Sequence, residues 1–392
     1  MRLFHVGCCA FLAGLSACGD SSQAKGGIWD ETENGVAVCV HDDAGMALSG
    51  ARVRLIPLES WSSEVASHVA LSYDSALTDG EGEVLLHTTS WPAVLTVSSS
   101  LGISAEVLYA ADSLHSVVPA AAAVLRGTFR ADSGVSVSTV HVAGTTWKAS
   151  VDSSGNFSFA EAPAGEQTLI AETAKSVEVV GNAQISAGDT ISLGVFAAPV
   201  EDEVLLDDFS DEIAANRYFS LTGTGWWYIY ADSLCSVSPS GAADLADSGY
   251  LSATFSIDSS SAVPFAMVGV DLEASIYGGD LTRARHDLSS LDSLTFLARG
   301  SGTMTVQIYS APDDSSKVYL YTQITLTDSW VTYSLQPSLF INDAGLSWDS
   351  LSPYVSGIGF ATQADAQLDL DDIILHGLDV ATLYPALAIN EE

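Results

Sequence analysis

Apolar and polar residues alternate along most of the chain from Gly35 to about Leu378, with the two-residue period of strands that bury one face. The first such run places valines at positions 36, 38 and 40, and a turn rich in Asp and Gly follows it. The hairpin signal Thr78-Asp79-Gly80-Glu81-Gly82 then precedes a strand over 84–87. Long runs of Ala, Leu, Glu and Lys with a helical period are absent from the sequence. The pattern therefore predicts an all-β protein.

The same succession of strands and turns recurs over residues 124–197, again with Asp and Gly at a hairpin tip. Two small β-sandwiches in tandem, residues 34–118 and 124–197, account for this repetition. Residues 198–204 contain Pro199 and three acidic residues, and we expect them to be a linker.

A third pattern of alternating strands occupies residues 205–378, with strands expected at 294–298, 303–309, 319–326, 330–335 and 358–362. Turns with Gly, Pro and Asp separate them. This length and this succession of strands and turns are typical of a jelly roll of two facing antiparallel sheets. The Ala- and Leu-rich residues 379–392 are expected to be a tail.

The first eighteen residues have one cation, Arg2, and an apolar run too short to span a bilayer. Residues 1–17 therefore look like a signal peptide. The stretch Leu15-Ser16-Ala17-Cys18 resembles a bacterial lipobox, which implies that Cys18 is lipidated and becomes the mature N-terminus. The alternative is ordinary secretory cleavage beside an incidental cysteine.

The polar residues 18–33 would be a tether. More than one acyl chain anchors a protein stably, and Gly19 after the cysteine implies transfer to the outer membrane. We expect a lipid-anchored protein at the cell surface, with no transmembrane helix in its mature chain.

Charge narrows the choice of partners. The chain has 13 Lys and Arg against 49 Asp and Glu, a formal net charge of −36. Nucleic acid, anionic lipid surfaces and anionic polymers would be repelled, whereas neutral ligands and cations are favoured. After the signal and Cys18, the remaining cysteines are Cys39 and Cys235, in different expected domains. Neither a disulfide framework nor a cysteine metal site is supported.

The first sandwich resembles carboxypeptidase regulatory-like domains, which are transthyretin-like sandwiches. The matching residues are Gly35, Val36, Asp43, Gly45, Leu48, Gly50, Ala51, Val53, Thr78, Asp79 and Gly82. The second sandwich lacks the Gly-Ala-x-Val element. The resemblance implies spacers or modest interaction modules, and no site is assigned to them.

The third domain opens with Leu205-Leu206-Asp207-Asp208-Phe209 and closes with residues 368–377, LDLDDIILHG. Together with residues 292–300 and 327–333, these ends resemble the galactose-binding-like jelly roll, and more narrowly family 11 carbohydrate-binding modules. The expected fold class is thus all-β, with two small Ig/transthyretin-like β-sandwiches followed by a galactose-binding-like β-jelly roll.

Carboxylates gather at the two ends of this domain, where the first and last strands would lie side by side. Unpaired carboxylates there would repel one another unless a cation joined them, and Ca²⁺ binds such oxygen ligands. Relatives in the resembled family carry structural calcium near these ends. The candidate ligands are Asp207, Asp208 and Asp371, with Asp372 facing the opposite way. Solvated turn residues in an acidic chain are an equal alternative.

The segment GWWYIYADS, residues 225–233, places Trp226, Tyr228 and Tyr230 on one face of a strand and Trp227 with Ile229 on the other. Rings with polar tips suit a partly wet surface, where a sugar's flat C–H face can stack. Tyr319 and Tyr321 alternate out of a second strand in the same way.

In the resembled family the strand equivalent to 319–326 lines the ligand cleft, and a later loop carries an aromatic residue where Trp348 stands. Gln307 and Gln363 could donate hydrogen bonds to a sugar. The candidate carbohydrate-binding residues are Trp226, Tyr228, Tyr319, Tyr321, Trp348 and Gln363. Packing in the core or at its rim is the alternative for each ring.

Motifs of catalysis that would fit their context, such as Gly-x-Ser-x-Gly or His-Glu-x-x-His, are absent from the sequence. The leading hypothesis is a non-catalytic surface lipoprotein that binds a neutral plant polysaccharide, a β-glucan or hemicellulose. An envelope or adhesion scaffold that binds protein is the alternative. A third hypothesis is an accessory component of a glycoside hydrolase system with its own activity, since 49 carboxylates make chance acidic pairs certain.

Overall fold

A computed structural model describes residues 35–111, 114–130, 135–211, 213–246, 249–276, 281–315 and 317–389. The predicted signal peptide, Cys18 and the tether lie outside these ranges. Strands dominate the described chain, and its longest helix has nine residues. None of the described helices is long and apolar enough to cross a membrane.

The first domain is a sandwich of a three-stranded sheet, order β4-β1-β7, and a four-stranded sheet, order β3-β2-β5-β6. Its strands are β1 (Gly35–Val40), β2 (Arg52–Pro57), β3 (Asp74–Leu77), β4 (Glu83–His87), β5 (Ala93–Ser98), β6 (Ile103–Leu108) and β7 (His115–Val117). The alternating Val36, Val38 and Val40 point into its core against Leu55 and Leu95. The two-residue alternation of apolar positions in β1 therefore corresponds to the face of the strand that is buried in the core, as expected.

The second domain is also a two-sheet sandwich, with orders β10-β9-β12-β13 and β11-β8-β14. Its strands are β8 (Ala123–Arg130), β9 (Thr139–Val142), β10 (Lys148–Ser150), β11 (Asn156–Ala162), β12 (Gly165–Glu172), β13 (Val177–Ile185) and β14 (Thr190–Ala197). Phe129, Phe157 and Phe159 fill its core together with the half-buried Phe196. Gly127 makes room for this cluster, because a Cβ there would lie 2.4 Å from the Phe157 ring.

The third domain packs a five-stranded sheet, order β16-β19-β24-β21-β22, against a six-stranded sheet, order β17-β18-β25-β20-β23, in which β15 pairs with β25. Its strands are β15 (Glu203–Asp207), β16 (Trp227–Ala231), β17 (Ser236–Ser238), β18 (Leu251–Ser256), β19 (Ala266–Asp271), β20 (Ser293–Ser301), β21 (Thr303–Ser310), β22 (Val318–Thr325), β23 (Val331–Leu335), β24 (Val355–Thr362) and β25 (Ala366–His376).

The first and last strands of this domain are antiparallel neighbours, as expected, with Leu205 opposite Ile374. β15 begins at Glu203, inside the segment expected to be a linker. The all-β fold class, with sandwiches followed by a jelly roll, is confirmed by these sheets.

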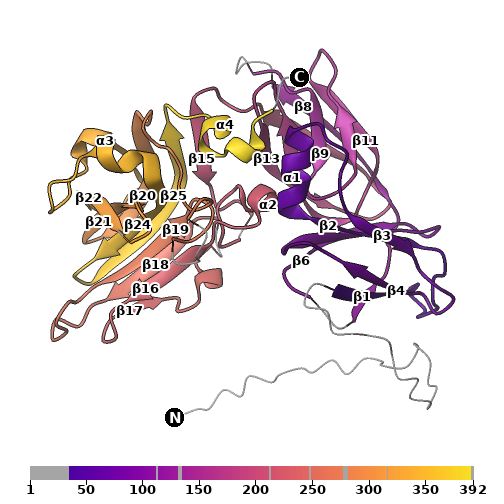
Figure 1. The fold of residues 1–392 in the computed structure, drawn as a ribbon, viewed down its shortest axis with the longest axis horizontal. Coiled ribbons are helices and arrows are strands. Elements are labelled where there is room, and N and C mark those ends of the chain that lie inside the picture. Colours follow the sequence, from indigo (N-terminus) through magenta and orange to yellow (C-terminus); the bar gives the residue numbers. More distant parts are fainter. Residues whose placement is uncertain are drawn as a thin grey trace, which may run out of the picture.

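Helix α1 (Leu58–Ala66) lies where the three domains meet (Figure 1). The Trp61 side chain is fully buried, donates from Nε1 to the Thr145 carbonyl at 2.7 Å, and packs edge-on against the His141 ring of the second domain. Ser62 donates to the Leu221 carbonyl of helix α2 (Phe219–Thr222) in the third domain. Helix α1 of the first domain thus contacts both the second and the third domain.

Residues 379–389, in the segment expected to be a tail, form α4 (Val380–Leu383) and the 3₁₀ turn η5 (Pro385–Leu387). Tyr384 is buried there, donates to the Leu272 carbonyl at 2.9 Å, and its ring centroid lies 4.7 Å from that of Tyr218. Ile389 donates to the Lys175 carbonyl of the second domain. Trp61, Val177, Tyr384 and the core of the third domain therefore belong to one continuous apolar cluster.

Replacement of Trp61 by Ala should destabilise the assembly of domains, because it removes a fully buried indole and leaves the Thr145 carbonyl without its partner. We expect the free energy of unfolding to fall by about 3–5 kcal/mol, measured by urea denaturation. The exposed Leu101→Ala serves as control and should change it by no more than about 0.5 kcal/mol. Equal effects of both substitutions would contradict the junction role of α1.

Candidate functional site

The five-stranded sheet of the third domain turns one face to the core and the other outward. Alternate residues such as Val268, Ile308 and Phe360 are fully buried between the sheets. Their neighbours on the opposite face are tyrosines, glycines and polar residues, together with Met267 and Ala361. This sheet therefore follows the alternation expected for strands with one core face and one outward face.

The strand register aligns these outward residues in rows that cross the sheet. In one row, Tyr228 lies opposite Gly269, Gly269 opposite Gly359, Gly359 opposite Gln307, and Gln307 opposite Tyr321. The row therefore places a tyrosine on each edge strand and two glycines in the centre.

The adjacent row contains the outward residues that lie two positions away along each strand. Asp271 lies opposite Gly357, Gly357 opposite Tyr309, and Tyr309 opposite Tyr319. At the β16 end, the Asp271 amide donates to the Trp226 carbonyl. Both rows thus combine aromatic ends with a glycine in the middle.

The central glycines allow two tyrosine rings to lie down on the sheet. A Cβ on Gly269 would come 2.7 Å from the Tyr228 ring, and one on Gly359 would come 2.8 Å from the Tyr309 ring. Tyr228 therefore covers β19, and Tyr309 covers β24. The Tyr309 hydroxyl contacts Gln307 and lies 3.3 Å from the Met267 sulfur. Side chains at the glycines would lift both rings off the sheet.

Tyr319 and Tyr321 continue this surface across β22. The ring centroid of Tyr319 lies 6.1 Å from that of Tyr309 and 6.0 Å from that of Tyr321. Tyr319 is 42% exposed to solvent. We call the set Tyr228, Tyr309, Tyr319 and Tyr321 the aromatic face. It brings together three residues that the sequence predicted and one, Tyr309, that it missed.

A loop after β23 holds the outer edge of the aromatic face. Ile341 exchanges backbone hydrogen bonds with Tyr321, and Asn342 donates to the Tyr319 carbonyl at 2.9 Å. The Tyr321 hydroxyl donates to Asp343, and this hydrogen bond raises the pKa of the phenol. Both β22 tyrosines are therefore positioned before any ligand arrives.

Trp226 and Trp227 point to opposite sides, as the alternation predicted. Trp227 is buried and donates from Nε1 to Asp207 at 2.7 Å. Trp226 is 43% exposed, and its ring packs on Phe219 and Tyr109 at centroid distances of 4.4 and 6.1 Å. Trp226 thus stands at the β16 edge of the aromatic face.

The other two candidates are carried by a helix and a turn rather than by strands of the sheet. Trp348 opens α3 (Trp348–Leu351) and packs beside Phe340 against the core, with its Nε1 buried and without a hydrogen-bond partner in the described chain. Gln363 is exposed in the turn after β24. Trp348 is half-buried at the rim of the core, and its part in binding a ligand stays a prediction.

The predicted calcium ligands have protein partners. Asp207 is buried, where it accepts hydrogen bonds from Trp227 and the Phe209 amide, and burial raises its pKa. Asp208 forms an ion pair with Arg217 at 2.7 Å. The Asp371 carboxylate accepts from the Asp372 amide.

Among the residues that the structure describes, no three His, Cys, Asp or Glu side chains are grouped to hold a metal ion. Each of the three candidate carboxylates has a hydrogen-bond or ion-pair partner within the protein. The assignment of Ca²⁺ to Asp207, Asp208 and Asp371 stays a prediction.

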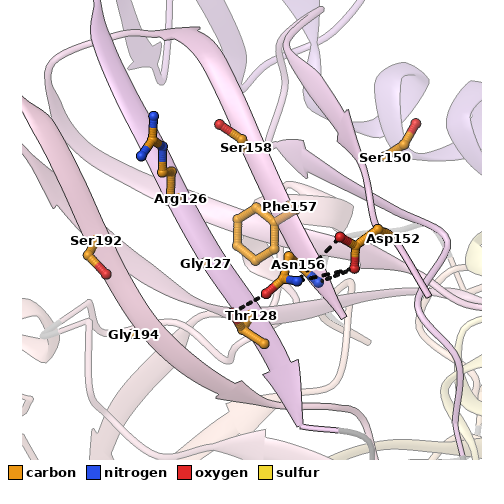
Figure 2. A pocket seen from close by; sticks show the side chains of 10 residues that line it. All are labelled: Arg126, Gly127, Thr128, Ser150, Asp152, Asn156, Phe157, Ser158, Ser192 and Gly194. Atoms are coloured by element: carbon orange, nitrogen blue, oxygen red, sulfur yellow. Dashed lines mark hydrogen bonds between the residues drawn. The ribbon is translucent and has the colours of Figure 1, made fainter. Parts of the chain in front are cut away.

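An open depression of about 540 Å³ lies on the second domain, at the outer face of its three-stranded sheet (Figure 2). Arg126, Ser158 and Ser192 project from its strands, and Thr128 donates to Asn156 at 2.8 Å. Its lining is mainly polar and includes one cation, Arg126, one carboxylate, Asp152, and a single aromatic ring, Phe157. It therefore offers fewer stacking surfaces for a sugar ring than the aromatic face does.

No protein-family model matches this chain, and no curated protein matches it. Among solved structures it is similar to the family 11 carbohydrate-binding module of the cellulosomal cellulase Lic26A-Cel5E of Clostridium thermocellum, at 17% identity and a TM-score of 0.32, over 45% of this chain and 95% of that one.

A family 11 module from Clostridium thermocellum in complex with a β-1,3-1,4-mixed-linked tetrasaccharide matches at 16% identity and a TM-score of 0.32, over 45% of this chain and 95% of that one. A family 30 carbohydrate-binding module matches at 14% and 0.26, over 36% and 69%. These identities and TM-scores are too low to assign a function. The assignment of the fold rests on the sheet topology.

Asp271 lies in a row of the outward sheet surface between Trp226 and Gly357, and burial raises its pKa to about 6 from an ordinary value of 3.8. The folded protein then keeps a proton that the unfolded chain releases between about pH 4 and 6. The free energy of unfolding therefore falls as the pH rises through this window.

We expect Asp271→Asn to stabilise the protein by about 2 kcal/mol at pH 7.5 and by almost nothing at pH 4, measured by urea denaturation at both values. The exposed Asp328→Asn is the control and should show no such difference between the two pH values. An equal gain from Asp271→Asn at both values would contradict the buried-charge explanation.

Proposed function

We propose that the protein is a non-catalytic surface lipoprotein that binds a neutral plant polysaccharide, a β-glucan or hemicellulose, through the aromatic face of its third domain. The observation that carries the proposal is the convergence of four tyrosines from three strands on one outward sheet surface, over a floor of glycines.

The chemistry of the aromatic face suits a sugar chain. Tyr228 and Tyr309 lie flat enough to stack on the C–H faces of sugar rings, while phenol hydroxyls, Gln307 and Asp271 are positioned to bond with sugar hydroxyls. The net charge of −36 disfavours anionic polymers and leaves neutral glycans as the better ligands.

Lipidation of Cys18 would tie this surface to the outer membrane, with residues 18–33 as the tether. A rigid junction of the three domains supports such display, because α1, α2 and α4 pack into one apolar cluster. The aromatic face would then be held in a fixed orientation relative to the two sandwiches.

Affinity electrophoresis of residues 19–392 in gels that contain mixed-linkage β-glucan, xylan or mannan tests the proposal. We expect retardation by at least one glycan, and about fivefold weaker binding after Tyr309→Ala, because one stacking ring is lost. Tyr73→Ala, which removes an exposed tyrosine beside Arg54 in the first sandwich, is the matched control and should bind as the unaltered protein does.

Unchanged mobility in every gel would reject glycan binding and favour an envelope or adhesion scaffold, since tyrosines also serve protein interfaces. Release of reducing ends from any of these polysaccharides would instead show an accessory enzyme. Equal weakening by Tyr309→Ala and Tyr73→Ala would remove the aromatic face from the binding site.

A further inference from the structure

Three aromatic rings from two domains pack together at the β16 edge of the aromatic face. Tyr109 follows β6 of the first sandwich, Phe219 belongs to α2, and Trp226 precedes β16. Ring centroids lie 6.1 Å apart for Tyr109 and Phe219, 6.1 Å for Tyr109 and Trp226, and 4.4 Å for Phe219 and Trp226. We call these residues the junction cluster.

The junction cluster continues one row of the sheet. Trp226 faces away from the buried Trp227, and its carbonyl accepts from the Asp271 amide, so it occupies the position beside Asp271 on the edge strand. Beyond Asp271 the same row passes through Gly357 and Tyr309 to Tyr319. A ligand that follows this row across the strands would pass over Trp226, whose outer side pairs with Ala215, and would there meet the ring of Tyr109.

Two members of the junction cluster face solvent although they pack on the third. Tyr109 is 54% exposed and Trp226 is 43% exposed, whereas Phe219 is 7% exposed. Phe219 therefore acts as a buried support that fixes the other two rings while large parts of their surfaces stay accessible. Adjacent exposed rings of this kind mark interaction sites more often than isolated ones do.

Contacts between the first and third domains hold Tyr109 in this place. Ser62 donates to the Leu221 carbonyl, and Arg283 of the third domain pairs with Glu59 of α1 at 3.0 Å. A Cβ on Gly223 would lie 2.9 Å from Pro92, which shows how closely the two domains approach beside the cluster. The position of Tyr109 relative to Trp226 is thus set before any ligand binds.

We propose that the first sandwich contributes the outermost ring of the glycan-binding site, so that Tyr109 and Trp226 form a subsite reached by long saccharide chains. The inference rests on the function proposed above. Five neighbouring strands span about 19 Å at the usual strand spacing. A short oligosaccharide can occupy the aromatic face alone, whereas a longer chain extends past β16 to Tyr109.

Isothermal titration of residues 19–392 with a tetrasaccharide and an octasaccharide of the retarding glycan tests this subsite. We expect Tyr109→Ala to weaken octasaccharide binding about fivefold and to leave tetrasaccharide binding unchanged. Tyr109→Phe keeps the ring and should restore octasaccharide binding. Tyr73→Ala, in the same sandwich but beside Arg54, is the matched control.

A loss of affinity confined to the longer ligand is the result that a merely structural role of Tyr109 would not produce. Equal octasaccharide affinity of Tyr109→Ala and the unaltered protein would overturn the subsite and leave the aromatic face intact. Equal weakening for both ligands would also overturn it, because the substitution would then act through the fold. Failure of the unaltered protein to bind either saccharide would reject the proposed function itself.

Discussion

The burial of Trp61 is the contact on which the arrangement of the three domains depends. Its indole crosses from the first sandwich to the Thr145 carbonyl of the second, while the next residue, Ser62, bonds to the third domain. Gly144 completes the fit, since a Cβ there would lie 2.2 Å from a Val94 methyl group. Each sandwich keeps a core of its own, but Trp61 of the first and Val177 of the second join the apolar cluster around Tyr384, so the three domains share an apolar junction.

This shared junction gives the first sandwich a part in the candidate site. A spacer joined by a flexible linker would leave the aromatic face of the third domain to act alone. Here the α1 and α2 contacts bring Tyr109 beside Trp226, so a residue of the first sandwich reaches the edge of the tyrosine-bearing sheet. The domain that looked like a simple spacer is therefore a structural neighbour of the site.

Period-2 alternation was sufficient to predict the all-β fold and the opposite directions of Trp226 and Trp227. The neighbouring positions of the first and last strands of the third domain followed instead from the jelly roll that its two ends resemble. The alternation was insufficient for Tyr309, because membership of the aromatic face depends on the register of β21 between β24 and β22, which is set by distant residues. Helix α1 has nine residues, and its stabilising partners lie in other domains, so a local pattern could not reveal it.

The position of β25 within its sheet has a consequence for the order of folding. This strand pairs with β15, β18 and β20, and its terminal His376 bonds to Glu203, 173 residues earlier. These three strands are synthesised before β25, so each keeps one edge unpaired until β25 is available. Unpaired strand edges can associate with other chains. Such non-local pairing makes closure slow, so a chain of this topology gains from being kept extended, or shielded by a chaperone, until the whole third domain has emerged.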